Sequence, residues 1–386
     1  MPASDPLRQE FQTAVARHAI APARVIRGEH AWREAVQPIA ALCQRPALLG
    51  RSPATHSLRT ELSQDLASIG LEVSALTLVH DCCEDDLHPL AHQIVSNNCD
   101  AVIAAGGGKV LDAGKLLADR LGLPCITVPL SASTCAGWTA LSNLYTPEGA
   151  FIQDVGLGQC PDLLIFDHGF LRQAPKRTLA SGIADALAKW YEASVSSGSS
   201  DDGLIQQAVQ MARVLRDQLM LDSVEALANE NSAAWCRVVE ACGLTAGVIG
   251  GLGGAQCRTV AAHAVHNGLT QLPASHDALH GEKVGFGILV QLRLEERLGG
   301  QQLAAQARKQ LLPLLKQLGV PVTLQDLGLG RAGLHELQHV CSFACQPGSD
   351  LHHLPFQVSD QDLLEALVST ESGWTEQDSQ HRETLA

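Results

Sequence analysis

Positive charge is scarce in this chain of 386 residues, which has 27 lysines and arginines against 41 aspartates and glutamates and a formal net charge of -14. Nucleic acids and anionic membranes are bound by clustered Lys and Arg, so this composition argues against both kinds of partner. No apolar run looks long enough to span a membrane, and residues 1–6 lack the basic and apolar stretches of a secretion signal. We therefore expect a cytoplasmic protein that acts on a small soluble molecule.

A regular cysteine framework is also missing. The twelve cysteines are scattered along the chain, and we interpret them as reduced core residues of a cytosolic protein. Two local pairs, Cys82-Cys83 and Cys341-x-x-x-Cys345, are weak metal-binding signals. Internal repeats and low-complexity linkers are absent too. With 46% hydrophobic residues, this length predicts two domains that share a tight interface.

The pattern that is present changes near residue 170. Before it, expected strands alternate with expected helices, at 46–50, 58–69, 73–78, 85–98, 101–105, 110–121, 125–129 and 163–166. This alternation predicts a parallel sheet covered on both faces. After Pro175 only helices are expected, at 179–194, 203–219, 232–246, 259–268, 283–298 and 302–318.

We therefore predict an α/β protein with a Rossmann-like parallel-sheet domain in residues 1–170. An all-helical domain follows in residues 171–386, and the active site is expected in the cleft between the two. The polar segment after about residue 373 is predicted to be a flexible tail.

Two loops that follow expected strands have the composition of a phosphate site. Residues 106–109 (GGGK) precede a helix that carries Asp112 and Lys115, so backbone N–H groups are exposed at a helix N-terminus, where phosphates bind. This is neither the six-position dinucleotide fingerprint nor the P-loop, and such a turn also occurs without a ligand. Residues 129–135 (PLSASTC) add three hydroxyl groups at the same edge of the sheet, which favours a nucleotide site.

Histidines form two clusters in the second half, His263-x-x-His266 and His276-x-x-x-His280, and both follow Asp185. The small residues around them allow close packing against a buried ion. One carboxylate and two imidazoles can bind a divalent metal and leave a coordination position open. Such a metal polarises a carbonyl or lowers the pKa of an alcohol, which indicates a catalytic centre.

Together these segments resemble the iron-containing alcohol dehydrogenases, in their glycerol dehydrogenase branch. The resemblance extends from about residue 25 to about residue 370, with the motifs in the family's order. It implies an N-terminal dinucleotide-binding domain, a helical domain with the metal, and hydride transfer in the cleft. The matching segments are 106–115 (GGGKVLDAGK), 131–134 (SAST), 139–149 (TALSNLYTPEG), 182–188 (GIADALA), 262–270 (AHAVHNGLT), 280–284 (HGEKV) and 352–355 (HHLP).

The resemblance also implies site residues. Asp185, His263 and His280 match the positions that bind one divalent metal, with zinc favoured and iron, manganese or nickel open. His266 is a candidate proton relay to solvent, or else a core histidine bonded to a backbone carbonyl. The family often forms dimers or octamers, so we expect a homo-oligomer. The expected cofactor-binding residues are Arg51, Ser52, Gly106, Gly107, Gly108, Lys109, Asp112, Leu130, Ser133, Thr134, Thr139, Leu141 and Tyr145.

Three positions near the expected metal differ from the glycerol dehydrogenase pattern and predict a carboxylate substrate. Cys135 stands where that pattern has an aspartate facing the polyol, so a negative charge is lost. Lys189 lies one turn after Asp185, where other branches have a further histidine ligand, and it either balances Asp185 or holds a substrate carboxylate. Arg258 replaces a small residue and can bind a carboxylate through two hydrogen bonds, although a surface position is the alternative.

A further difference concerns the cofactor. NAD-specific relatives place an aspartate after the strand 46–49, where it bonds the adenosine ribose, whereas this chain has Arg51 and Ser52. A positive charge and a hydroxyl suit a 2′-phosphate, so the sequence favours NADP(H) over NAD(H).

The sequence thus predicts a metal-dependent oxidoreductase that transfers hydride between NADP(H) and a small 2-oxo or 2-hydroxy carboxylic acid, similar to hydroxycarboxylate dehydrogenases. Its expected catalytic residues are His266, Lys189, Arg258 and Cys135. The first alternative is a glycerol or diol dehydrogenase that uses NAD. From other classes, we consider a lyase similar to 3-dehydroquinate synthase and a nucleotide sensor without catalysis.

Overall fold

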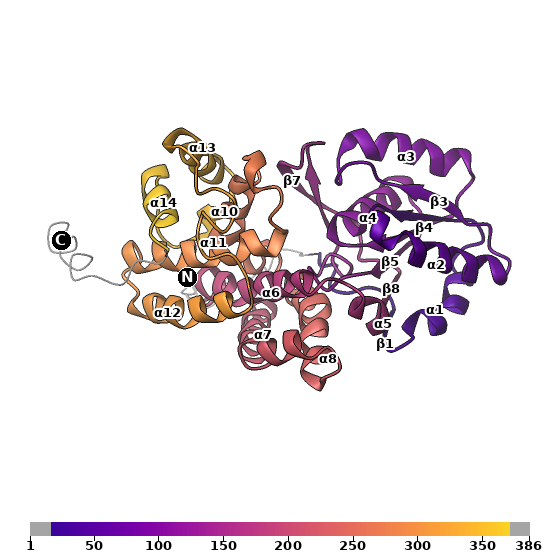
Figure 1. The fold of residues 1–386 in the computed structure, drawn as a ribbon, viewed down its shortest axis with the longest axis horizontal. Coiled ribbons are helices and arrows are strands. Elements are labelled where there is room, and N and C mark those ends of the chain that lie inside the picture. The colour runs from indigo at the N-terminus through magenta and orange to yellow at the C-terminus, as the bar shows by residue number, and fades with distance from the viewer. Residues whose placement is uncertain (1–16, 371–386) are drawn as a thin grey trace, which may run out of the picture.

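The computed structural model describes residues 17–370, so the predicted tail after residue 373 lies outside the described part (Figure 1). Its first half forms a six-stranded parallel sheet with the strand order β1-β8-β5-β4-β2-β3. The predicted parallel sheet is confirmed. Its strands are β1 (Val25–Gly28), β2 (Pro46–Gly50), β3 (Ser74–Thr77), β4 (Ala101–Gly106), β5 (Cys125–Pro129) and β8 (Leu163–Asp167).

Helices cover both faces of this sheet because its strands are apolar on both sides. In β4, Ile103 points to the face covered by α1 (Ala31–Ala40) and α2 (His56–Ser68). The neighbouring residue Val102 points to the opposite face, covered by α3 (Glu84–Ser96) and α4 (Gly108–Leu121). Successive strand residues alternate between faces, so an unbroken apolar run is what a sheet buried on both sides requires.

A two-stranded antiparallel hairpin, β6 (Leu141–Tyr145) and β7 (Phe151–Gly156), was not predicted. It lies between the sheet and the helices (Figure 1). The backbone N–H of Phe151 donates to the Thr270 hydroxyl at 2.9 Å, and the Gln271 amide donates to the Phe151 carbonyl at 3.1 Å. The hairpin therefore ties the first half of the chain to the second.

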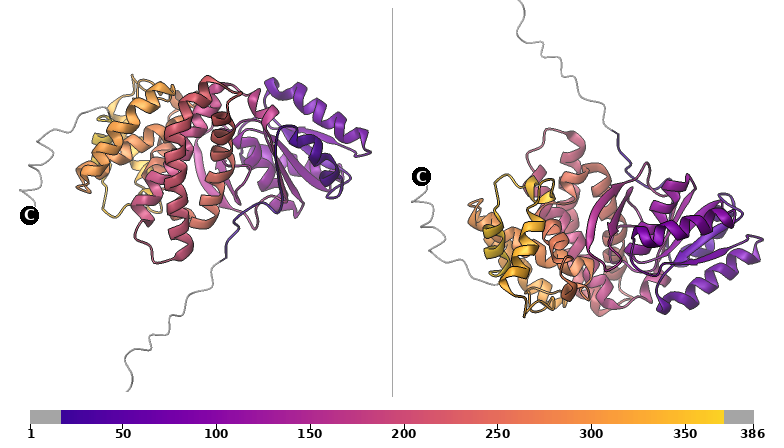
Figure 2. Two further views of the ribbon diagram at one scale, coloured as in Figure 1. Left: turned by 90° about the horizontal axis from the view of Figure 1, so that it is seen from below. Right: turned by 90° about the horizontal axis from the view of Figure 1, so that it is seen from above.

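From residue 168 to residue 370 the regular structure is helical, as predicted, and Figure 2 shows these helices as a body beside the sheet. The boundary at residue 170 stays a prediction. The helices of this half are α5 (His168–Arg172), α6 (Lys176–Ser197), α7 (Gly203–Ala228), α8 (Ala233–Glu240), α9 (Ala246–Gly253), α10 (Ala261–Leu269), α11 (His280–Arg297), α12 (Gln302–Gln317), α13 (Leu334–Ala344) and α14 (Asp360–Leu367). Strand β1 and helices α1, α5, α9, α13 and α14 had no predicted counterpart.

The expectation that no segment has membrane-spanning length needs correction. Among the described residues, the helical stretch Ala233–Gly253 is long and apolar enough to cross a membrane by length and composition alone, and 61% of its apolar 18-residue window is buried within the protein. It consists of α8, a π-helical turn (Ala241–Thr245) and α9. Trp235, Val238 and Ile249 belong to the main core of the helical half, so core packing accounts for its apolar character.

Two glycines bring the helices of the site close together. A Cβ on Gly182 in α6 would lie 1.9 Å from the Ala132 carbonyl oxygen, in the loop after β5. A Cβ on Gly281, at the start of α11, would lie 1.9 Å from the Ser181 carbonyl oxygen. Glycine at these positions lets α6 touch the hydroxyl-rich loop on one side and α11 on the other.

Candidate active site

Asp185, His263 and His280 meet in the interior although they come from three helices, α6, α10 and α11. The Nε2 atoms of His263 and His280 lie 3.4 and 3.5 Å from Asp185 Oδ1. That carboxylate oxygen is buried and has no hydrogen-bond partner in the part of the chain that the structure describes. An unsatisfied carboxylate oxygen facing two imidazole nitrogens fits a divalent metal ion, because the ion would satisfy all three atoms.

The pKa values in this group reflect its close charges. Burial would raise the pKa of Asp185, but the charge of Lys189 and the nearby imidazoles of His263 and His280 hold it well below its usual value. Burial would also lower the pKa of His263, but the neighbouring Glu192 carboxylate raises it to about 9. Asp185 is therefore a carboxylate in the folded chain, as a metal ligand must be.

Glu192 is a site residue that the sequence analysis missed. It is fully buried on α6, and His263 Nδ1 donates to its Oε2 at 2.7 Å. Its other oxygen accepts from the backbone N–H groups of Val260 at 2.7 Å and His263 at 3.0 Å. Glu192 therefore caps the start of α10 and turns His263 Nε2 toward Asp185. Its position seven residues after Asp185, two turns along one helix face, was the available signal.

His266 contacts His280 and does not line the cavity next to the three candidate ligands. His280 Nδ1 and His266 Nε2 are 2.9 Å apart, and His266 Nδ1 lies 2.9 Å from Asn267 Oδ1. Burial lowers the pKa of His266 well below its usual value, so the neutral ring accepts from His280 and donates to Asn267. Its partners are side chains, and the predicted alternative of a backbone carbonyl partner is wrong. His276 is bonded to the Thr270 carbonyl and lies outside the group.

A cavity of about 120 Å³ adjoins the three candidate ligands, and Cys135, Lys189 and Arg258 line it. Lys189 is buried, and its ammonium donates to the Arg258 carbonyl at 3.3 Å. The Nε atom of Arg258 is buried without a hydrogen-bond partner among residues 17–370. This part of the Arg258 side chain therefore lies inside the protein, while the residue as a whole is half-buried.

Acidic side chains line other parts of the same cavity. Asp154 comes from β7, and Asp350 precedes α14. Burial, together with the nearby charge of Asp154, raises the pKa of Asp350 to about 6. His353 Nδ1 lies 3.7 Å from the Asp350 carboxylate. The cavity therefore contains both cations and carboxylates, and only a substrate with a polar end suits it.

A larger groove of about 740 Å³ continues from this cavity along the carboxyl edge of the sheet. His280 and Lys109 line both spaces. Leu130 is buried in the core of the sheet and lines neither of them. The predicted cofactor residues that line the groove are Arg51, Ser52, Gly106, Gly107, Gly108, Lys109, Ser133 and Thr134. Those that line the smaller cavity but not the groove are Asp112, Thr139, Leu141 and Tyr145.

Asp81 is a second residue that the sequence analysis missed. Its nearly buried carboxylate receives Arg51 Nη1 at 2.5 Å on one oxygen and the Lys109 ammonium on the other. Arg51 and Lys109 are each 41% exposed at the side chain. One carboxylate thus holds two cations at the groove, and either cation remains accessible to a ligand phosphate.

Comparison with known proteins agrees with this architecture. Residues 22–168 match the family model described as iron-containing alcohol dehydrogenase. An uncharacterised oxidoreductase of Synechocystis is 52% identical over 91% of each chain. The chain belongs to the iron-containing alcohol dehydrogenase family. It is therefore an oxidoreductase, and the predicted family and enzyme class are confirmed.

Family members that act on different substrates by name are similar to this chain. Hydroxycarboxylate dehydrogenase A of Escherichia coli is 35% identical, covering 75% of this chain and 80% of its own. The crystal structure of glycerol dehydrogenase from Schizosaccharomyces pombe superimposes with a TM-score of 0.82 at 26% identity, covering 97% of this chain and 94% of its own. The two-domain fold of the family is therefore confirmed, whereas the substrate differs between relatives.

Proposed function

We propose that the protein transfers hydride between NADP(H) and a small 2-oxo or 2-hydroxy carboxylic acid, with a divalent metal, zinc by preference, held by Asp185, His263 and His280. A metal in that position supplies Lewis acidity to the substrate oxygen. The observation that carries the choice of substrate is the buried, unpartnered Nε of Arg258 in the cavity wall.

Arg258 and Lys189 suit a carboxylate because both line the cavity and both have N–H donors that are free to bind a ligand. A buried guanidinium N–H without an acceptor costs free energy, and a substrate carboxylate would remove that cost. Lys189 has a backbone carbonyl partner, which leaves further donor hydrogens of its ammonium group for a ligand. Cys135 adds no charge to the same wall, since burial raises the pKa of its thiol.

NADP(H) is supported by the groove beside this cavity. Arg51, Ser52 and Lys109 border it and offer two positive charges and a hydroxyl, and the 2′-phosphate of the cofactor needs such donors. Asp81 opposes this preference because it compensates part of the charge. The two exposed cations outnumber the one carboxylate, so we retain the preference for the phosphorylated cofactor.

Glycerol or diol oxidation with NAD is the second candidate. Asp154 and Asp350 in the cavity wall favour it, because carboxylates accept hydrogen bonds from hydroxyl groups. The glycerol dehydrogenase names among the relatives support it as well. A lyase or a sensor has no such specific support.

The substrate is tested by assaying metal-reconstituted protein with a panel of 2-oxo acids and, in the reverse direction, with glycerol and diols. We expect turnover of a 2-oxo acid, and a KM for it that Arg258→Gln raises by roughly tenfold to a hundredfold, as for a lost charged hydrogen bond of about 1.5–3 kcal/mol. Arg33→Gln, at an exposed position on α1, is the matched control. Faster turnover of glycerol, with an unchanged KM in Arg258→Gln, would favour the polyol instead.

The cofactor preference has its own variant. Arg51→Asp replaces the cation by a carboxylate at the groove, so we expect the KM for NADPH to rise at least tenfold while that for NADH changes little. Steady-state rates with both cofactors measure this. An equal rise in the KM for NADH and for NADPH would show that Arg51 supports the groove without binding the 2′-phosphate.

A further inference from the structure

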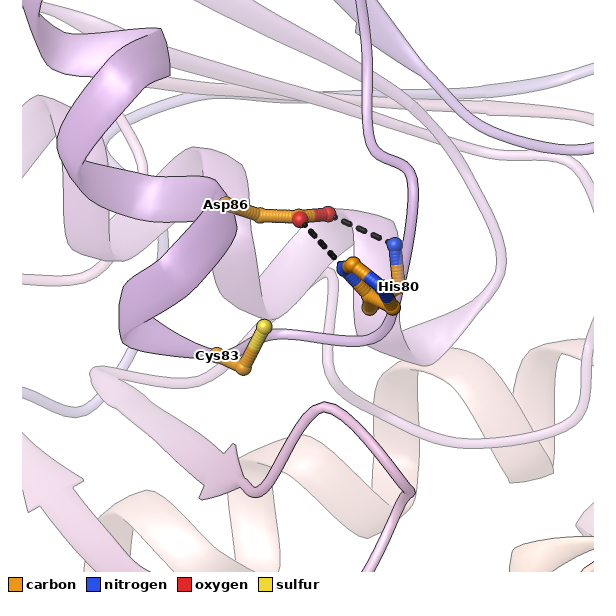
Figure 3. A group of neighbouring side chains, drawn as sticks. All are labelled: His80, Cys83 and Asp86. Atoms are coloured by element: carbon orange, nitrogen blue, oxygen red, sulfur yellow. Dashed lines mark hydrogen bonds and ion pairs between the residues drawn. The ribbon is translucent and has the colours of Figure 1, made fainter.

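A second group of metal-ligating side chains lies in the loop between β3 and α3. His80, Cys83 and Asp86 place one nitrogen, one sulfur and one oxygen within 4.8 Å of one another. In Figure 3 the imidazole faces the carboxylate, and the thiol points toward the space beneath them. We propose that these three side chains form a zinc site separate from the candidate catalytic centre.

The carboxylate of this group is held in place by the loop backbone. Asp86 Oδ2 accepts from the backbone N–H groups of Val79 at 2.7 Å and His80 at 2.8 Å. Its Oδ1 lies 2.8 Å from His80 Nδ1. Tetrahedral zinc with bonds of about 2.0–2.1 Å needs its oxygen and nitrogen ligands roughly 3.3 Å apart. A shift of about half an ångström in the His80 ring therefore brings this nitrogen and this oxygen to the spacing of two zinc ligands.

The burial of the three side chains differs in a way that suits a metal site. Cys83 and Asp86 are buried, whereas the His80 side chain is 44% exposed. Cys83 and Asp86 thus lie inside the protein, and His80 lies at its surface. An exposed imidazole can turn aside to admit the ion and then close on it, which supplies the entry path that such a site needs.

Helix capping alone does not account for a cysteine at this position. Cys83 is the N-cap residue of α3, and its side chain makes no capping hydrogen bond of ordinary geometry, although the backbone N–H groups of Asp85 and Asp86 lie near its thiol. Ser, Thr, Asp and Asn are the residues that normally fill this role, and a thiol is a poor acceptor. Asp85 adds negative charge in the first turn of the helix, which attracts a cation, whereas the charge of Glu84 is paired with Arg120 at 2.6 Å.

The ligand types favour zinc over the common alkaline-earth ions. Magnesium and calcium bind oxygen ligands, whereas a thiolate and an imidazole suit zinc. Binding would release the Cys83 proton to solvent, and a water molecule would complete the tetrahedron. The segment Leu78–Val79 borders the nucleotide groove, but none of the three proposed ligands belongs to the candidate active site.

Cobalt(II) titration of the full-length, metal-free protein tests this proposal, because thiolate bound to cobalt gives a near-ultraviolet charge-transfer absorption. The candidate catalytic ligands contain no sulfur, so the absorption reports the second site. We expect it in the wild type and in Asp185→Asn, with zinc abolishing it by competition. Cys83→Ser should remove it, and the exposed variant His80→Ala should weaken cobalt binding there by at least about tenfold.

Cys135→Ser is the matched control, since Cys135 is a thiol in the catalytic cavity. Retention of the absorption in Cys135→Ser supports the proposal. Absence of the absorption in the folded wild type, its persistence in Cys83→Ser, or its loss in Cys135→Ser would each overturn it. Circular dichroism confirms that each variant is folded.

Discussion

Glu192 determines the orientation of one candidate metal ligand and the start of the helix that carries it. Replacing it with glutamine would place an amide N–H opposite His263 Nδ1 or leave a backbone N–H without its acceptor. In the first case the His263 proton moves to Nε2, the atom that faces Asp185. The consequence reaches the metal although Glu192 is not among its proposed ligands.

We therefore expect Glu192→Gln to lower zinc affinity at the candidate catalytic site by roughly tenfold to a hundredfold. Competition with a chromophoric chelator measures this affinity. Glu225→Gln, at an exposed position of α7, is the control for the general effect of removing a carboxylate. An unchanged zinc affinity in folded Glu192→Gln would contradict the role given to this residue.

Among single residues, the sequence predicted the candidate metal ligands, but it did not predict the carboxylates that orient a ligand or hold a cation. Asp185, His263 and His280 come together as predicted because each stands in a motif with recognisable spacing. Glu192 and Asp81 were missed because their partners are distant in sequence, backbone N–H groups and cations that only the packed helices and loops bring near them.

Helix α6 is the element on which the site depends most. It carries Asp185, Lys189 and Glu192, and its Gly182 lies against the loop that carries the hydroxyl groups of the nucleotide groove. The close approach fixes the distance between the candidate metal ligands and the groove. A side chain at position 182 would separate them, because the atom it meets belongs to the backbone and has little room to move.

Gly182→Ala should accordingly destabilise the protein by about 1–3 kcal/mol and reduce turnover even in the fraction that folds. Thermal unfolding followed by circular dichroism and kcat at a permissive temperature are the measurements. Gly203→Ala at the start of α7 is the control, since no atom lies within 4 Å of its added Cβ. If both variants behave alike, the contact with Ala132 is unimportant.

Elements were predictable where burial leaves a regular pattern. The strands β4, β5 and β8 are buried throughout and are apolar apart from Thr127 in β5 and Asp167 at the end of β8. The hairpin β6–β7 was not predicted because β7 contains only exposed and half-buried residues, so no apolar period marks it. Helix α9 was not predicted because it is rich in glycine, which has a low helix propensity. In the folded chain these glycines pack closely against neighbouring side chains.

For the whole molecule, the fold followed from the sequence more readily than the reaction partners. The order of strands and helices depends on many residues, whereas the substrate depends on a few side chains such as Arg258 and Asp154. Their charges oppose one another within one cavity. Composition and periodicity do not report such local balances, so substrate and cofactor stay proposals.

Global stability should depend on pH through Glu295, a buried residue of α11. Burial raises its pKa from 4.5 to about 7, although Gln291 donates to its Oε1 at 3.0 Å. The folded chain therefore keeps this proton up to about pH 7, whereas the unfolded chain releases it near pH 4.5. Stability falls as pH rises through this interval, and the loss persists above it.

Glu295→Gln cannot ionise at this position, so its unfolding temperature should equal that of the wild type near pH 4.5. Between about pH 4.5 and pH 7 its unfolding temperature should rise relative to that of the wild type, and above about pH 7 the difference should stay constant. Melting curves across this range measure the difference, with Glu225→Gln as the exposed control. A difference that does not vary with pH would show that Glu295 is not the titrating group.

The hairpin β6–β7 has a consequence for synthesis on the ribosome. Its outer strand is hydrogen-bonded to Thr270 and Gln271, which leave the ribosome only after about 120 further residues. At roughly 5–20 residues per second, the sheet half waits on the order of 6–24 s with this strand edge unpaired. A nascent chain exposed in this way is a natural target for chaperones, and truncation before residue 270 should favour aggregation.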